Sequence, residues 1–345
     1  MDFSIASILI LDGTTNGAIY GLLGLVIVLV FTVTRIIFIP EGEFVAYGAL
    51  SLSMMQLGKV PGTIWLLLIL ATLAALMNAL ESYQQTKSTQ SGALAFVKTM
   101  WPSVLVSALT CLIIPQNPPL WLQALLCVCI VTCFGPLVYR VAFQSLEDAP
   151  SLVLLIVAVA VHFAMTGLGL LFFGAEGYHN PPFWAETFQW QSLRFSGQTL
   201  LIFALSFVLI VALWLFFEKT LRGKALRATA VNRTGVRLVG ISSRQSGNLC
   251  FTLAAMICAI SGLLIGPTTT IFYDSGFLIG LKGFVAAIIA GLYSYPGAML
   301  SAIMVGIIES FGSFWASSFK EVIVFTLILP VLLWRSIQGG SHEES

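Results

Sequence analysis

The chain is a succession of long apolar runs separated by short polar segments, and this pattern limits its possible folds more than any other feature. A transmembrane helix needs about 20 apolar residues. Only 9% of the 345 residues are charged, against about 25% in soluble domains. The sequence therefore predicts an all-α polytopic membrane protein of about 8–11 transmembrane helices. Candidate spans lie at residues 8–34, 44–58, 61–80, 99–114, 119–138, 151–173, 198–217, 247–266, 277–292, 297–314 and 319–335.

The distribution of lysine and arginine predicts the direction in which the chain crosses the membrane. Because cytoplasmic loops are enriched in these residues, we place segment 218–244 in the cytoplasm. Counting spans outward from it puts the N-terminus outside and the C-terminus inside. Segment 174–197 is then external, either a docking surface or an ordinary loop with interfacial aromatic residues. Segment 218–244 holds seven of the sixteen basic residues, Lys219, Arg222, Lys224, Arg227, Arg233, Arg237 and Arg244.

The chain lacks the residues that several functional classes require. A net charge of +1 gives no indication of a nucleic-acid partner. Cys127, Cys129 and Cys133 lie in an apolar run without a Cys-x-x-Cys pair, so we predict that they pack inside a helix and bind no metal. His162 stands alone in span 151–173, where we expect a packing or hydrogen-bonding role. No catalytic constellation appears in the spans, which predicts a protein that is not an enzyme.

Lys282 and Glu309 are the ionisable residues deepest in the candidate spans. A charge at the centre of a membrane costs about 2.5–3.5 kcal/mol on insertion scales, so such residues usually face a wet cavity or a partner. One interpretation is that they line a transport pathway or pair across helices. The other is that the span edges lie elsewhere and that both residues sit at the membrane interface.

Two groups of motifs carry a resemblance to a known family. One group lies in the basic segment and comprises Thr220, Gly223, Ala225, Arg227, Ala228 and Ala230, followed by Arg237, Leu238, Gly240 and Ile241. The other comprises Gly280, Leu281, Lys282, Phe284, Ala286 and Ala287, followed by Gly291, Ser294, Pro296, Gly297, Ala298 and Glu309. In this order and spacing the motifs resemble the permease family of branched-chain amino acid ABC transporters, over about residues 1–80 and 138–337.

The resemblance implies a coupling role for the basic segment. In the family this region docks on a cytoplasmic ATPase, and here the corresponding residues are Thr234, Gly235, Arg237, Leu238, Gly240 and Ile241, with the loop motif Gly223, Arg227 and Ala230. The chain has no Gly-x-x-x-x-Gly-Lys-[Ser/Thr] phosphate loop, so ATP and Mg²⁺ are expected on partner subunits and no cofactor in this chain. The alternative is that the basic residues only anchor the topology.

The function implied is that of a multi-pass permease in the bacterial inner membrane. It would form half of an importer's pathway for branched-chain amino acids or related small carboxylates. The implied partners are two cytoplasmic ATPase subunits, a second homologous permease and a periplasmic substrate-binding protein, besides the lipid bilayer. The alternative function is an ion-coupled secondary transporter of small organic solutes, which needs no docking segment and favours acidic residues near mid-membrane.

The sequence departs from the family pattern at three places. In loop 38–44 Gly42, Glu43 and Phe44 match, but Glu41 stands where the family has histidine. Glu41 either influences the ligand or complements the dipole of the helix that follows it. Gly235 replaces alanine and is expected to fray or kink the coupling helix. Candidate pathway residues are accordingly Glu41, Gly42, Glu43, Lys282 and Glu309.

The third departure is an insertion at about residues 81–138, expected to be peripheral and to face lipid or a partner. The predicted organisation is a single transmembrane domain over 1–337, with a coupling loop at 218–244 and a cytoplasmic tail at 338–345. Residues 41–46 and 281–286 are weakly alike and their spans are predicted to cross in opposite directions, as in an inverted repeat. Gly276 and Gly280 form a Gly-x-x-x-Gly pattern, which indicates close helix packing.

Overall fold

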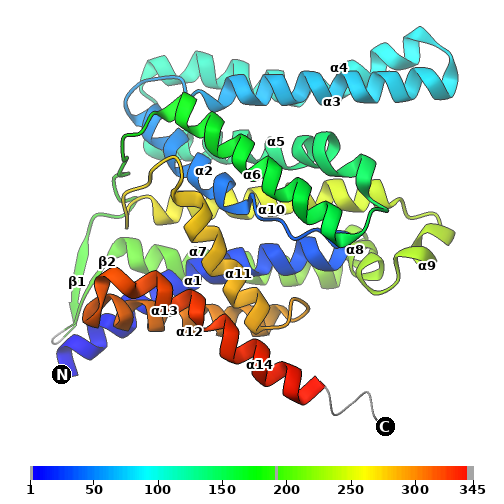
Figure 1. Cartoon of the computed structure of the whole chain (residues 1–345). Coiled ribbons are helices and arrows are strands. Elements are labelled where there is room, and N and C mark those ends of the chain that lie inside the picture. The colour runs from blue at the N-terminus through cyan, green and yellow to red at the C-terminus, as the bar shows by residue number, and fades with distance from the viewer. Residues whose placement is uncertain (1–2, 191–192, 340–345) are drawn as a thin grey trace.

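The computed structural model describes residues 3–190 and 193–339 and is a bundle of helices (Figure 1). Within this part of the chain eight helices are long and apolar enough to cross a membrane. They confirm the prediction of an all-α polytopic membrane protein. These helices are α1 (Phe3–Thr34), α3 (Thr63–Thr86), α4 (Thr89–Ile113), α5 (Leu120–Val138), α6 (Ser151–Phe173), α7 (Gly197–Lys219), α10 (Ser243–Ile265) and α12 (Tyr295–Trp315).

The remaining helices are shorter. Two of them, α2 (Glu41–Gln56) and α11 (Ser275–Ile289), replace the short runs expected at 44–58 and 277–292. The run at 319–335, expected as one span, is instead divided into α13 (Lys320–Thr326) and α14 (Ile328–Gly339), preceded by a 3₁₀ turn (Ser317–Phe319). The break has a local cause, because Pro330 has no N–H to donate to the carbonyl of Thr326. Residues 340–345 of the predicted tail lie outside the described part.

Segment 174–197 contains the two strands that the structure describes. Strand β1 (Thr187–Trp190) pairs antiparallel with β2 (Leu193–Ser196), and Phe188 lies opposite Phe195. A single bridge between Tyr178 and Ile271 ties the start of this segment to the loop before α11. The segment therefore folds against the same end of the bundle at which α1 begins (Figure 1).

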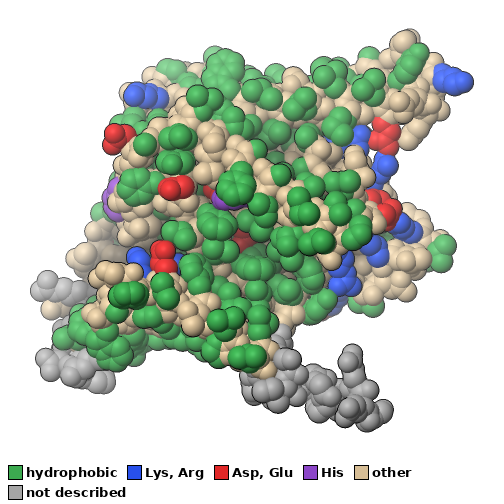
Figure 2. All heavy atoms as spheres, in the orientation of Figure 1, with side chains coloured by type: hydrophobic (Ala, Val, Ile, Leu, Met, Phe, Trp, Pro, Cys, Tyr) green, Lys and Arg blue, Asp and Glu red, His purple; other side chains and the backbone are tan. Residues whose placement is uncertain are grey.

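Charged side chains gather at the opposite end of the molecule. That end carries α8 (Leu221–Val231) and α9 (Arg233–Leu238), which form the basic segment. Figure 2 shows apolar side chains over the broad middle of the face and blue and red side chains crowded at this end. The first helix begins at the far end and α14 points toward the α8–α9 side (Figure 1). The positive-inside rule predicts that the α8–α9 end faces the cytoplasm.

The centre of the bundle is built from two sets of helices that run in opposite directions. Helix α1 lies beside α10, and α2 crosses α11. Each short helix also packs on the long helix of the other set, α2 on α10 and α11 on α1. The third members, α5 and α12, lie against α10 and α1 respectively. This reciprocal packing is the arrangement that an inverted repeat produces, and it agrees with the weak likeness of 41–46 to 281–286.

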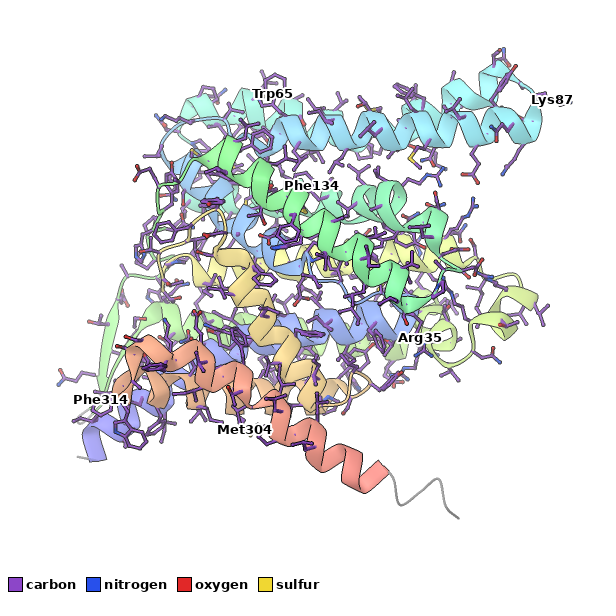
Figure 3. All side chains as sticks on the ribbon, viewed as in Figure 1. Arg35, Trp65, Lys87, Phe134, Met304 and Phe314 are labelled. Carbon is purple, nitrogen blue, oxygen red and sulfur yellow. The ribbon has the colours of Figure 1, made fainter. Side chains whose placement is uncertain are left out.

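The expected peripheral insertion applies to only part of segment 81–138. Helices α3 and α4 form a hairpin at one edge of the bundle, with Trp65 and Lys87 on it (Figure 3). Helix α5, in contrast, is packed between α2, α3 and α10, and its Phe134 is fully buried. In the inverted arrangement α5 is the partner of α12. Of the two helices in the predicted insertion, α4 therefore lies at the edge of the bundle and α5 in its core.

Helices α2 and α11 touch through glycine. A Cβ atom at Gly42 would overlap the backbone carbonyl of Gly276, and one at Gly280 would lie 3.0 Å from the Cα atom of Gly42. Small residues allow helix backbones to approach this closely, and dispersion contacts between them then stabilise the pair. The Gly-x-x-x-Gly pattern of α11 thus serves packing, as expected, and it serves the crossing with α2 in particular.

We predict that Gly42→Ala lowers the stability of the protein, because the new methyl group forces the two backbones apart. Overpacking of this kind costs about 1–3 kcal/mol. The matched control is Gly167→Ala in α6, where an added Cβ meets no atom within 4 Å. Thermal unfolding of the detergent-solubilised protein is the measurement. Equal unfolding temperatures for the two variants would contradict the close crossing.

Candidate functional site

The first candidate site begins where α1 ends. Arg35 adopts a positive φ of 63° and donates a hydrogen bond to the hydroxyl of Tyr293 at 2.9 Å. From this turn the chain runs back into the bundle through loop 35–40, in which Ile36 and Phe38 are buried. Helix α2 therefore starts inside the protein and not at the membrane surface (Figures 1 and 3).

Two acidic residues lie in the first turn of α2, and both are buried. Glu43 is fully inaccessible, and its Oε1 accepts from Nδ1 of His162 at 2.5 Å and from the hydroxyl of Thr166 at 3.4 Å. Neither carboxyl oxygen of Glu41 has a hydrogen-bond partner in the described structure. The helix dipole explains why an acidic group is tolerated here. It does not supply a partner, and burying a charged carboxyl group without one is costly.

His162 has a role that the sequence did not reveal. Its expected hydrogen-bonding function is confirmed, but its partner, Glu43, is 119 positions away along the chain. The imidazole ring also lies 4.6 Å from the ring of Phe277 on α11. His162 thus connects three helices, α6, α2 and α11. The sequence showed only that Glu43 and His162 are ionisable residues in separate spans. That observation does not specify which residues pair.

The glycines of α11 make room for the acidic turn. Oε2 of Glu43 lies 2.6 Å from the position that a Cβ atom at Gly276 would occupy, and Cγ of Glu41 lies 3.6 Å from the corresponding position at Gly280. A side chain at Gly276 would compete with the Glu43 carboxyl group for space, and one at Gly280 would press on the backbone of Gly42. A cavity of about 10 Å³ beside Glu41 is lined by Phe38, Phe277 and Gly280 among others.

Lys282 and Glu309 form a buried ion pair between α11 and α12. Nζ of Lys282 lies 2.6 Å from Oε1 of Glu309 and 3.4 Å from the hydroxyl of Tyr20 on α1. Their side chains are 7% and 9% exposed. The interpretation that they pair across helices agrees with this contact. Because 200° of helical rotation separates positions 280 and 282, the pair lies on a different face of α11 from the acidic turn of α2.

The second candidate site is the pair of short helices α8 and α9. The Thr220 hydroxyl accepts from the backbone N–H of Gly223 at 3.0 Å, and the Asn232 side chain accepts from that of Gly235 at 2.8 Å. Both helices thus begin at capping residues. Helix α9 runs through Gly235 without a break from Arg233 to Leu238, and the Gly235 N–H is the one that the cap satisfies. Arg227 pairs with Glu218 at 2.8 Å on the exposed side of α8, and Ala230 is half-buried there.

Helix α9 is anchored through Arg237, whereas the next residue, Leu238, is exposed. Arg237 donates to Glu147 at 3.0 Å, to Asp148 at 2.9 Å and to the Ser243 hydroxyl at 2.8 Å. Leu238, in contrast, is 85% exposed. The acidic pair before α6 is the part of this site that the sequence reasoning missed.

The other predicted coupling residues surround the exposed end of α9. Thr234 is exposed, and Gly240 has a φ of 85°, which turns the chain back toward α10. The backbone N–H of Ile241 then donates to the carbonyl of Val236 at 3.1 Å. Val239, between Leu238 and this turn, is 75% exposed. The segment thus presents a short apolar tip, Leu238 and Val239, beside the arginine that anchors α9.

We predict that Lys282→Met destabilises the protein by about 3–5 kcal/mol, because it leaves Glu309 buried without a partner. The double variant Lys282→Met/Glu309→Gln should recover most of this loss, since neither residue is then charged. Thermal unfolding of the purified variants checks both expectations. A double variant that is as unstable as the single one would show that the ion pair is not the source of the effect.

Comparison with known proteins places the chain in a family. A family model described as "Branched-chain amino acid transport system / permease component" matches residues 91–332. The high-affinity branched-chain amino acid transport system permease protein BraD of Pseudomonas aeruginosa is 29% identical over 240 residues, 67% of this chain and 78% of BraD. The permease protein LivH of Escherichia coli K12 is 29% identical over 215 residues, 60% of this chain and 69% of LivH.

A more distant relative comes from an archaeon. The probable branched-chain amino acid transport permease protein LivH of Methanocaldococcus jannaschii is 29% identical over 144 residues, 39% of this chain and 46% of that protein. No solved structure matches the chain. The family model covers more than half of the sequence and includes α9 and both members of the Lys282–Glu309 pair. The chain therefore belongs to the branched-chain amino acid transport system permease family and is a multi-pass membrane subunit of a transport system, not an enzyme.

Proposed function

We propose that this chain forms one half of the translocation pathway of an ABC importer for branched-chain amino acids or related small carboxylates. An importer permease of this kind works with an ATPase and a substrate-binding protein. The finer assembly that we propose has two ATPase subunits, which carry ATP and Mg²⁺, a second homologous permease and a periplasmic binding protein in a bacterial inner membrane.

The observation that carries the proposal is the exposed apolar tip on a clamped helix. Leu238 and Val239 are exposed at the end of α9, where no membrane lipid would cover them in the predicted topology. An exposed leucine next to charged residues is suited to insert into a hydrophobic pocket of a partner protein. The ion pairs of Arg237 with Glu147 and Asp148 would then transmit the partner's movement to the start of α6.

Helix α6 continues this mechanical connection into the bundle. Its residue His162 contacts Glu43 on α2 and Phe277 on α11. Movement of α6 would therefore act on the crossing of the two short helices. An ATPase that binds one arrangement of α9 more tightly than another would shift the population of the permease between its inward-open and outward-open states.

Glu41 is the residue that we propose as a contact for the substrate's ammonium group. Its carboxyl group is buried without a partner at the start of α2, and an amino acid carries a positive charge that would satisfy it. The cavity of about 10 Å³ beside it is too small for an amino acid. The structure would thus represent a closed state of the permease. Access of the substrate to Glu41 would require α2 and α11 to separate.

One observation favours a second candidate function. A buried carboxyl group without a partner next to a Glu–His pair is also suited to carry a proton. That arrangement would serve an ion-coupled secondary transporter. The two candidates differ in their energy source, because uptake by the importer requires ATP, whereas uptake by the secondary transporter follows an ion gradient.

We predict that Leu238→Asp prevents recovery of the ATPase with the tagged permease from solubilised membranes, because a charged side chain cannot enter an apolar pocket without a large desolvation cost. The matched control is Val60→Asp, an exposed apolar residue in the loop between α2 and α3 at the opposite end. The control should recover the ATPase at wild-type levels.

Two results would count against this assignment. Equal recovery of the ATPase by both variants would remove the tip from the interface. Recovery of the permease alone, together with uptake that is insensitive to ATP depletion, would favour the secondary transporter.

We predict that Glu41→Gln lowers the uptake of labelled leucine at least tenfold in cells that express the complete transport system. The amide has nearly the same shape as the carboxyl group but carries no negative charge to pair with an ammonium group. Because it removes a buried ionisable group, the change should leave the unfolding temperature unchanged or raise it. Glu176→Gln, at an exposed carboxylate in the outer loop, is the control. Wild-type uptake by Glu41→Gln would exclude the proposed contact.

A further inference from the structure

A cavity of about 520 Å³ lies between the α3–α4 hairpin and the rest of the bundle. It is enclosed by α3 and α4 on one side and by α5 and the first turns of α10 on the other. The cavity opens near the end of the molecule that carries α8 and α9, since Arg244 at its rim is the last residue of segment 218–244. None of the roles proposed above uses this space.

The rim of the cavity is charged. Glu81 on α3 accepts hydrogen bonds from two arginines, from Nη2 of Arg140 at 2.6 Å and from Nη1 of Arg244. Two guanidinium charges thus face one carboxylate, which leaves a surplus of one positive charge. Arg140 is buried, whereas the side chain of Arg244 is 51% exposed and is the accessible member of the cluster. The rim therefore attracts an anion without having to give up the Glu81 contacts.

The inner part of the cavity is uncharged and less polar than the rim. Ala74, Pro102, Cys133 and Leu137 line it, together with the small hydroxyl of Ser103. Asn78 and Thr99 also line the cavity, and the two side chains bond to each other at 2.9 Å. Along α3 the lining extends from Gln85 to Ala74, about 16 Å at 1.5 Å per residue. The space is thus positively charged at one end and uncharged and partly apolar at the other, a polarity that suits an amphiphile.

The backbone at the rim is unusual as well. Arg140 belongs to a π-helical turn, Tyr139–Phe143, that continues α5 just after Pro136. Proline removes a hydrogen bond from the helix ladder, and π-turns occur frequently at functional sites. The turn carries Arg140 toward Glu81 and brings it to the same rim as Arg244 from another helix.

We infer that this cavity binds the headgroup and upper acyl chain of an anionic phospholipid from the leaflet on the α8–α9 side. The lipid phosphate would interact with Arg244 and the surplus charge of the arginine pair, and its acyl chain would lie along the apolar wall between α3 and α5. Basic pockets between transmembrane helices on the cytoplasmic side bind anionic lipids in this way. The bound lipid would join the α3–α4 hairpin to α10, next to the coupling segment.

The test measures the lipid that the delipidated full-length protein retains after incubation with equal amounts of phosphatidylglycerol and phosphatidylcholine. Native mass spectrometry of the purified protein gives the ratio of the two lipids. We expect the wild type to retain phosphatidylglycerol in excess. Arg244→Gln should lower this retention about fivefold, the factor that one basic residue near an anionic membrane surface supplies.

Two further variants separate the cavity from general charge effects. Lys87→Gln removes a positive charge at the tip of the same hairpin, outside the cavity (Figure 3), and should behave like the wild type. Ser82→Trp fills the cavity without changing any charge and should reduce retention as Arg244→Gln does. Unfolding temperatures in phosphatidylcholine alone check that each variant is folded. If Arg244→Gln does not fold, Ser82→Trp decides the question.

Three results would overturn the inference. The first is that the wild type retains the two lipids equally. The second is that both cavity variants retain as much phosphatidylglycerol as Lys87→Gln. The third is that inorganic phosphate displaces phosphatidylglycerol from the wild type, which would assign the cavity to a soluble anion and not to a lipid.

Discussion

The close crossing of α2 and α11 is the contact on which the rest of the structure depends. Gly42, Gly276 and Gly280 allow the two backbones to touch, and no larger residue fits at these positions. This contact holds the start of α2 inside the bundle, so that Glu41 and Glu43 are buried there. It also connects the two oppositely directed sets of helices, because each short helix packs on the long helix of the other set.

The buried charges are tolerated because most of them are paired. Glu43 has His162, and Lys282 has Glu309 and Tyr20. Glu41 has no partner among the described residues, and it lies at the crossing where the two short helices would have to separate. In an apolar environment an unpaired ionisable group is costly and usually has a functional reason. This is the physical basis for placing substrate contact at Glu41 and structural support at Lys282.

The polar end of the molecule is organised by a different principle. Acidic residues there are held by arginines from distant segments, Glu81 by Arg140 and Arg244, and Glu147 by Arg237. These ion pairs attach the α3–α4 hairpin and the α8–α9 segment to the same group of helix ends. A force applied at α9 and a lipid bound beside α3 would therefore act on neighbouring parts of one network.

The sequence by itself determined the membrane class, the positions of most helices and the family, because apolar run length and ordered motifs are local properties. From its basic residues it also predicted a coupling role for segment 218–244. It also indicated that Lys282 and Glu309 needed partners. Only the tertiary structure decided which residues pair: Glu43 with His162, Arg237 with Glu147 and Asp148. It likewise decided that α5 belongs to the core and α3–α4 to its edge. Pairing and burial depend on contacts between segments far apart in the chain, and apolar runs look alike whether they face lipid or protein.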